Sequence, residues 1–171
     1  MALNQSDRFD DVVNEEGIDY IVEETGEKRK YFYSRSAFWR LIKDLLAEYD
    51  EHDEWNQRIV WSNLYKIAPY TTGNPNWSLV KPEMPTYIEC ILEEIRLYKP
   101  KSVLFVTGLD YLAPWESEPT FIDALNIKES KENPYVLGVG HYENSKILVC
   151  VRPEKKKTDE MAKIIKAAFE D

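Results

Sequence analysis

The spacing of hydrophobic residues changes several times along the chain, and each change marks an expected element. Two runs of β-forming residues within Ile18–Tyr33 flank the turn sequence Thr25-Gly26-Glu27, which predicts a β-hairpin. Apolar residues then recur at helical spacing, starting just after Ser36, which is a candidate N-cap. We expect this helix to end near Asp50.

The middle of the chain contains a strand pattern, a long loop and the clearest helix pattern. Arg58–Leu64 has the composition of a buried strand that runs into a loop. Pro69–Pro82 is rich in residues that break regular structure, and ordered loops of this length often belong to a functional site. Glu83–Tyr98 places apolar residues on one helical face and is followed by Lys99-Pro100, which ends a helix.

The C-terminal third continues the alternation of strands and helices. Lys101–Gly108 is a short apolar run ending in glycine, as expected for a strand covered on both faces. The later segments are a helix or irregular cover over Trp115–Leu125, strands over Tyr135–Val139 and Lys146–Val151 on either side of Gly140–Ser145, and a helix over Thr158–Phe169 capped at Thr158.

This order of elements predicts the α/β class, with a three-layer α/β/α sandwich around a small, mostly parallel central sheet. Residues 1–17 show no periodicity and are interpreted as an acidic flexible lead-in, and residues 18–171 as a single domain. In such folds, sites form at the carboxyl ends of the strands. Those ends are expected at Asn63, at Thr107-Gly108 and at Arg152-Pro153.

The acidic net charge of the chain indicates which classes of binding partner are expected. The chain has 171 residues and a net charge of −9, and acidic residues are concentrated in Met1–Glu27 and between Asp44 and Glu54. Proteins that depend on phosphate contacts usually carry a basic excess, whereas the one compact basic run here is Lys155–Lys157 next to Arg152. The acidic residues are interpreted as a solvated face, with binding of a basic protein partner as the alternative.

Several kinds of chemistry have no support in the sequence. No apolar run approaches the roughly 20 residues that span a bilayer, and the polar N-terminus is unlike a signal peptide, so a cytoplasmic location is expected, with Cys90 and Cys150 as free thiols. The chain contains two histidines, His52 and His141, interpreted as a surface residue and as a structural residue of a turn. No phosphate-binding glycine loop is present, and neither a metal nor a cofactor is expected.

Asn63 is the main candidate for recognition chemistry. A side-chain amide offers a donor and an acceptor together, which is the pattern that reads the edge of a nucleobase. Four aromatic residues follow or precede it closely and are candidates for stacking on a base: Trp61, Tyr65, Tyr70 and Trp77. The alternatives are that Asn63 caps a turn through its own backbone and that the aromatic residues pack in the core and loop.

Short motifs in this order resemble the uracil-DNA glycosylase superfamily over about Phe38 to Lys157. The most specific are Trp61–Lys66 and Pro100–Gly108, together with Gly73-Asn74-Pro75 and a late strand followed by Arg-Pro. The resemblance implies that Asn63 reads an extruded base and that the strand ending at Gly108 forms the floor of its pocket. In the superfamily, a His-Pro pair at the end of the last strand stabilises the leaving base and inserts beside the DNA.

The sequence departs from the superfamily at two places. Arg152-Pro153 stands where the superfamily has His-Pro, and an arginine cannot reproduce the hydrogen bonding of a neutral imidazole. The glycine-rich first motif, which positions water, is also missing before Ser36, where the hairpin Ile18–Tyr33 stands instead and Asp19 is a poor substitute. The chain is therefore either a degenerate member or lacks an upstream segment.

The resulting hypothesis is a glycosylase-like protein that binds a nucleobase or single-stranded nucleic acid, with weak or absent hydrolysis of the N-glycosidic bond. The alternative is a non-enzymatic regulatory or interaction protein whose acidic face binds a basic protein partner. A third, weaker idea is hydrolysis of another small substrate, for which no nucleophile is visible. Catalytic residues are not assigned; the expected base-binding residues are Asn63, Tyr65, Trp77 and Gly108, and the expected nucleic-acid contacts are Lys66, Arg152 and Pro153.

Overall fold

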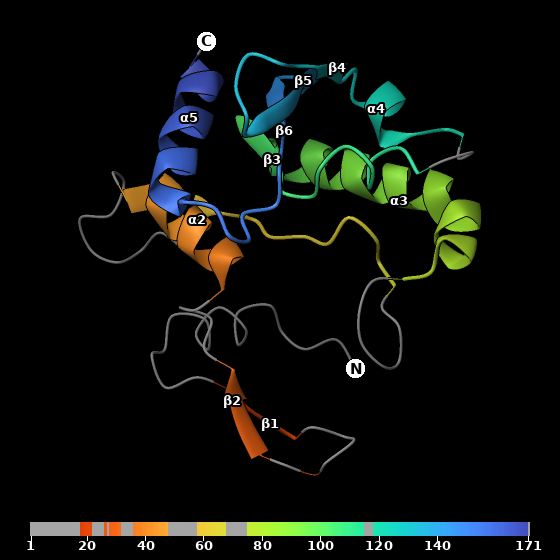
Figure 1. Cartoon of the computed structure of the whole chain (residues 1–171). Coiled ribbons are helices and arrows are strands. Elements are labelled where there is room, and N and C mark those ends of the chain that lie inside the picture. Colours follow the sequence, from red (N-terminus) through yellow and green to blue (C-terminus); the bar gives the residue numbers. More distant parts are fainter. Residues whose placement is uncertain are drawn as a thin grey trace. The chain divides into compact units, whose positions relative to one another are not determined.

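The computed structural model describes residues 18–21, 26, 28–31, 36–47, 58–67, 75–114 and 118–170. Its elements are β1 (Ile18–Ile21), β2 (Lys28–Tyr31), α2 (Ala37–Leu46), α3 (Trp77–Tyr98), β3 (Ser102–Phe105), α4 (Phe121–Ala124), β4 (Lys128–Glu129), β5 (Val136–Tyr142), β6 (Ser145–Cys150) and α5 (Thr158–Glu170) (Figure 1). The chain divides into two compact units, Met1–Ile59 with Pro153–Ala162, and Val60–Arg152 with Lys163–Asp171. Among the described helices, none has the length and apolar character needed to cross a membrane.

The first unit contains the hairpin and helix predicted near the N-terminus. β1 and β2 pair antiparallel, with Ile18 opposite Tyr31. Ser36 precedes α2 in an extended conformation, and its carbonyl oxygen accepts a hydrogen bond from the Arg40 amide at 3.0 Å. Its hydroxyl makes no capping hydrogen bond, so the predicted start of the helix is confirmed while the side-chain cap is wrong. Asp50, the expected end, lies outside the described residues.

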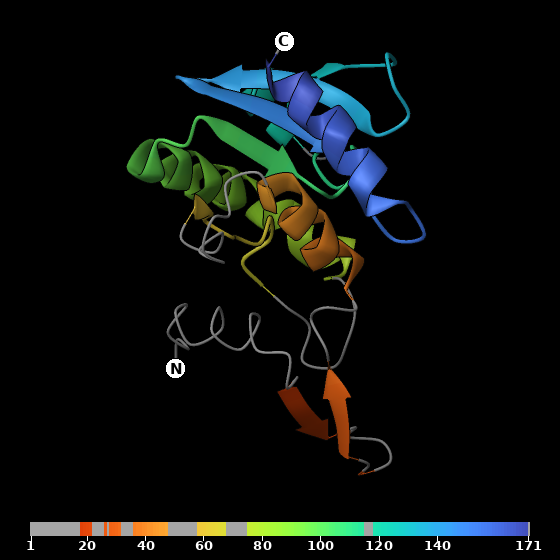
Figure 2. The same cartoon turned by 90° about the vertical axis from the view of Figure 1, so that its left-hand side faces the viewer.

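The sheet of the second unit has the strand order β3-β6-β5-β4. β3 and β6 are parallel, whereas β6 with β5 and β5 with β4 are antiparallel. The fold is therefore mixed α/β, and the expected mostly parallel sheet is wrong. The cause is the connection between β5 and β6, where Tyr142 pairs with Ser145 across two turn residues. So short a connection can join only antiparallel strands. Figure 2 shows β5 and β6 as the long light-blue hairpin beside the green β3.

Two glycines in β5 allow the chain to pass very close to this strand. A Cβ atom at Gly140 would lie 2.6 Å from the carbonyl oxygen of Leu125, and one at Gly138 would lie 2.8 Å from Cγ2 of Ile127. The sequence placed Gly140 and His141 in a turn. Both residues lie instead in β5, where His141 is exposed. Gly140 is a glycine because residues 125–127 approach the strand too closely for a side chain, and not because the chain turns there.

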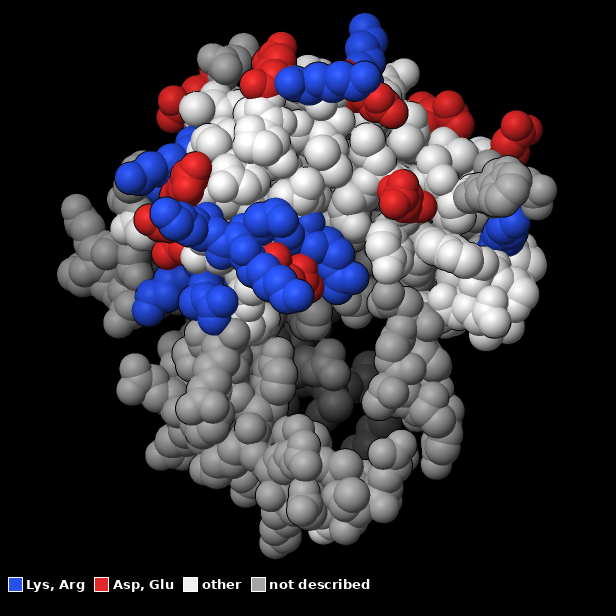
Figure 3. Space-filling model, in the orientation of Figure 1, with Lys and Arg blue, Asp and Glu red and all other residues white. Residues whose placement is uncertain are grey.

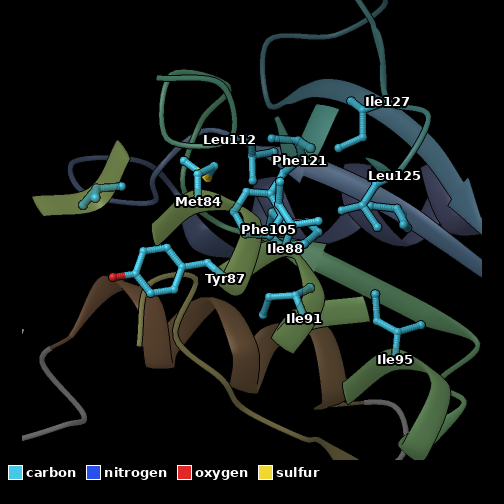
Figure 4. Close-up of a cluster of buried hydrophobic side chains, with 13 residues drawn as sticks. Met84, Tyr87, Ile88, Ile91, Ile95, Phe105, Leu112, Phe121, Leu125 and Ile127 are labelled. Atoms are coloured by element: carbon cyan, nitrogen blue, oxygen red, sulfur yellow. The ribbon is translucent and has the colours of Figure 1, made fainter. Parts of the chain in front are cut away.

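A buried cluster joins α3 to one face of this sheet (Figure 4). The cluster takes Val80, Met84, Tyr87, Ile88, Ile91 and Ile95 from α3, Phe121 from α4, and Phe105, Leu112, Leu125, Ile127, Ile147 and Val149 from the sheet and the loops around it. The alternate residues of β6, Leu148 and Cys150, are also fully buried. Since neighbouring side chains of a strand point to opposite faces, β6 is buried on both faces, as its apolar sequence predicts.

Helix α3 begins six residues earlier than the sequence predicts. The Asn76 side chain accepts a hydrogen bond from the Ser78 amide at 3.0 Å and caps a helix that starts at Trp77. Pro82 and Pro85 therefore lie inside the helix, although proline lacks the amide that helices use. The N-cap of Asn76 and the burial of Val80 and of other residues on the same face outweigh the two missing hydrogen bonds, a balance that local sequence rules do not capture.

The strand expected over Arg58–Leu64 is not formed. Residues 59–63 follow an irregular path, residues 64–66 form a bend, and the Val60 side chain is 56% exposed (Figure 1). An apolar run becomes a strand only where another strand satisfies its backbone groups. No described strand pairs with this segment.

The remaining segments agree with the sequence more closely. The segment that was expected to be a helix or an irregular cover contains a single helical turn, α4, capped by the Thr120 hydroxyl. Helix α5 spans Thr158–Glu170 close to the predicted range, but Thr158 is its first helical residue and not its cap, since the Lys157 carbonyl oxygen accepts the hydrogen bond from the Met161 amide. Both cysteines are free, with Cys150 buried and Cys90 half-buried. His52 lies outside the described residues.

Candidate functional site

Parallel pairing of β3 and β6 brings two of the predicted strand ends together. Phe105 lies opposite Val149, and beyond the last paired residues the Gly108 amide donates to the Cys150 carbonyl oxygen at 3.0 Å. Gly108 has a φ of +81°, in the left-handed region where glycine carries no steric penalty. It therefore lies beside the residues of β6 that lead to Arg152, which is exposed.

Four aromatic side chains form a cluster in the same unit, called here the aromatic cluster: Tyr65, Trp77, Tyr87 and Tyr111. The ring of Tyr65 lies 6.2 Å from Trp77 in an edge-on arrangement and 5.5 Å from Tyr87, measured between centroids, and Trp77 lies 5.6 Å from Tyr111. The cluster joins the bend at 64–66, helix α3 and the turn after Gly108. The structure thus brings together two expected stacking residues, Tyr65 and Trp77.

Tyr65 is held in the cluster by its hydroxyl, which donates to the Tyr111 carbonyl oxygen at 2.5 Å. Burial raises the pKa of Tyr65 well above its ordinary value, and the neighbouring hydroxyls of Tyr111 and Tyr87 raise it further. The phenol therefore stays protonated and keeps donating. This bond fixes the bend at 64–66 against the loop that follows the end of β3.

Lys66 is paired on the protein itself. Its Nζ lies 2.7 Å from Glu94 Oε1 of α3 and donates to the Ser62 hydroxyl. Exposed pairs of this kind contribute about 0–1 kcal/mol to stability, so the pair does little for the fold. Its main consequence is that part of the positive charge expected to meet phosphate is already offset by Glu94.

Asn63 and Trp77 are both accessible to a ligand. Asn63 is exposed, two residues before Tyr65, on the irregular segment rather than at the end of a strand. The prediction that it emerges from a strand end is therefore wrong, although its side chain does meet solvent. Trp77 is 41% exposed at the first residue of α3. Tyr70 and the Gly73-Asn74 part of the loop lie outside the described residues.

The two residues of the Arg-Pro pair that follows β6 differ in their exposure to solvent. Arg152 is exposed, whereas Pro153 is buried and its carbonyl oxygen accepts a hydrogen bond from the Lys156 amide. The expected contact between Pro153 and nucleic acid would require the ring to become exposed. Lys155–Lys157 are exposed, and Figure 3 shows Lys and Arg side chains gathered on the face that it draws.

Sequence reasoning missed two members of the aromatic cluster. Tyr87 stands four residues before Ile91 and eight before Ile95, so its place on the buried helical face was visible in the spacing. Tyr111 follows Gly108 by three residues, in the loop where a site at the end of a strand would be expected. Within the described ranges, no three His, Cys, Asp or Glu side chains gather as a metal site would need.

Fold and site together define a mixed α/β protein with an aromatic cluster beside the carboxyl ends of a parallel strand pair. Comparison with protein-family models, with curated proteins and with solved structures found no match. The resemblance to the uracil-DNA glycosylase superfamily therefore stays a proposal that rests on the motifs alone.

Proposed function

We propose that this chain binds a nucleobase, free or within single-stranded nucleic acid, at the aromatic cluster and the adjoining ends of β3 and β6. It would be a divergent uracil-DNA glycosylase-like protein that hydrolyses the N-glycosidic bond weakly or not at all. One observation carries the proposal. A single short loop links Gly108, which is bonded to the end of β6, to Tyr111, which contacts both Tyr65 and Trp77.

Trp77 is the ring on which we propose that the base stacks. It is partly exposed, and its neighbours Tyr65 and Tyr111 meet it edge-on or tilted rather than face to face. Stacking of a base on an aromatic side chain contributes about 1–3 kcal/mol and tolerates any base. Preference for one base would then come from the Asn63 amide, which is exposed two residues before Tyr65.

Arg152 is proposed to lie against phosphate or the leaving base. A guanidinium is permanently charged and offsets negative charge that develops on a departing base. It does not position water, and we assign no residue of the described ranges to that task. Asp19, the one candidate from the sequence, lies on β1 in the other unit. Weak or absent hydrolysis follows from this lack of an assigned water-activating group.

Two finer statements accompany this proposal. We propose that residues 163–170 of α5, which belong to the same unit as the sheet, cover the second face of β6 and complete three layers; the burial of Leu148 and Cys150 on that face and of Ile165 on α5 supports this. We also propose that the protein works in the cytoplasm. The alternative function, an acidic face for a basic partner, rests on residues that lie mostly outside the described ranges.

Fluorescence anisotropy with a labelled single-stranded oligonucleotide carrying one uracil tests the proposal. The comparison strand is identical except for an abasic site in place of the uracil nucleotide. We expect the wild type to bind the uracil strand more tightly, and Asn63→Ala to lose this preference. Asn144→Ala, at an exposed asparagine of the β5–β6 turn, serves as the matched control and should keep it. Equal binding of both strands by the wild type would refute base binding.

A second assay separates binding from hydrolysis. The protein is incubated with the uracil-containing strand, and alkali then breaks the strand wherever a base has been removed. Little or no breakage is expected. Efficient breakage by the wild type, absent in Asn63→Ala, would show that the chain is an active glycosylase and that an unassigned group positions the water.

A further inference from the structure

The Tyr87 hydroxyl is buried and unsatisfied. The residue is 3% exposed, and its hydroxyl oxygen has no hydrogen-bond partner. Buried polar groups in native proteins are nearly always paired, because losing water without gaining a partner costs free energy. Tyr65 in the same cluster obeys this rule through its bond to Tyr111. The exception at Tyr87 calls for a specific cause.

The position of Tyr87 points to the candidate site. Its ring is 5.5 Å from Tyr65, and Tyr65 in turn contacts the partly exposed Trp77, so three rings in contact connect Tyr87 to the exposed edge of the aromatic cluster. Figure 4 shows the hydroxyl projecting away from the labelled apolar side chains of the buried cluster. The ring belongs to the core, while its polar end faces away from it.

We propose that Tyr87 is a specificity-determining residue that hydrogen-bonds the polar edge of the bound base. This inference rests on the proposed function and deepens it. A phenol hydroxyl donates one hydrogen bond and also accepts, so it complements the carbonyl and ring N–H groups on the edge of a base such as uracil. A base stacked on Trp77 would turn its polar edge past the Tyr65 ring toward this hydroxyl.

The proposal predicts effects of opposite sign on stability and on binding for Tyr87→Phe. Phenylalanine keeps the ring and removes only the unpaired oxygen, so the free protein should melt at the same temperature or higher. Binding of the uracil strand should weaken about tenfold, the usual effect of losing one hydrogen bond to a ligand. A purely structural role predicts no change in binding.

The experiment compares wild type, Tyr87→Phe and Tyr98→Phe in the anisotropy and thermal-unfolding assays. Tyr98 is 52% exposed at the opposite end of α3, so its variant should match the wild type in both. Unchanged binding in Tyr87→Phe, with the wild type still preferring uracil, would overturn the inference alone. A lowered melting temperature would also overturn it, because the hydroxyl would then be satisfied within the protein. Equal binding of the uracil and abasic strands by the wild type would overturn both proposals.

Discussion

Substitution of Gly140 by alanine is expected to destabilise the protein through a collision between two backbone segments. A Cβ atom there would lie 2.6 Å from the Leu125 carbonyl oxygen and 2.9 Å from Cγ1 of Ile127. The first of these neighbours is backbone, so relief requires residues 125–127 to move away from β5. Those residues include the buried side chains of Leu125 and Ile127, and their movement would loosen the core.

The size of the effect follows from comparison with overpacked cores, where inserted groups cost about 1–3 kcal/mol. Because the nearest atom at Gly140 belongs to the backbone, we expect the upper part of that range. Gly138→Ala is the matched control. Its nearest neighbour, 2.8 Å away, is the Cγ2 methyl group of Ile127, a side-chain atom rather than backbone, so a smaller loss of about 1 kcal/mol is expected.

Urea unfolding followed by far-ultraviolet circular dichroism measures both variants against the wild type. For a chain of this size each kcal/mol corresponds to a shift of about 2–4 °C in melting temperature, which gives an independent check. The reasoning would be refuted if Gly140→Ala were no less stable than Gly138→Ala. In that case the segment 125–127 would not lie as close to β5 as described.

Three further predictions follow from the site and the core. Trp77→Ala should weaken binding of single-stranded nucleic acid about tenfold, whereas Tyr98→Ala should leave it unchanged; equal losses in anisotropy would argue against stacking at Trp77. Glu94→Gln should release Lys66 from its ion pair, which raises the affinity for nucleic acid and makes that affinity depend more steeply on salt concentration. The free energy of unfolding should change by less than about 1 kcal/mol. An unchanged salt dependence would show that Lys66 does not contact nucleic acid. Burial raises the pKa of Cys150 from 9.0 to about 12, so folding favours the protonated thiol. The contribution of this thiol to the free energy of unfolding should be constant below pH 9 and fall between pH 9 and 12. Cys150→Ala should abolish this fall in unfolding curves measured across that range.

Elements whose signals are local were predicted well from the sequence. The hairpin of β1 and β2, the start of α2 and the whole of α5 depend on spacing and turn residues that lie next to each other in the chain. The antiparallel direction of the sheet was missed, even though β5 and β6 are neighbours in the chain. Glu143-Asn144 closes the β5–β6 hairpin without the glycine that usually marks such a turn, so no local signal indicated antiparallel strands.

In the candidate site, too, features with local signals were predicted and features that depend on distant segments were not. The position of Gly108 just beyond β3 follows from the apolar run before it, whereas the pairing of that strand with β6 is known only from the structure. Asn63 was placed on a strand because its neighbours are apolar, but that segment has no described strand to pair with. The unpaired hydroxyl of Tyr87 could not be predicted for another reason. An aromatic residue at a core position is expected to pack there, and the missing partner of its hydroxyl depends on side chains that are distant in the sequence.

The strand order also bears on how the protein folds. β5 and β6 are joined by two residues and can pair early, whereas β3 must close a loop of about 40 residues to lie parallel to β6. Pairings between distant segments cost more chain entropy before they form, so β3 is expected to dock late. The bond between Gly108 and Cys150 forms only after that docking. A folding intermediate with the hairpin in place would therefore carry much of the sheet and none of the candidate site.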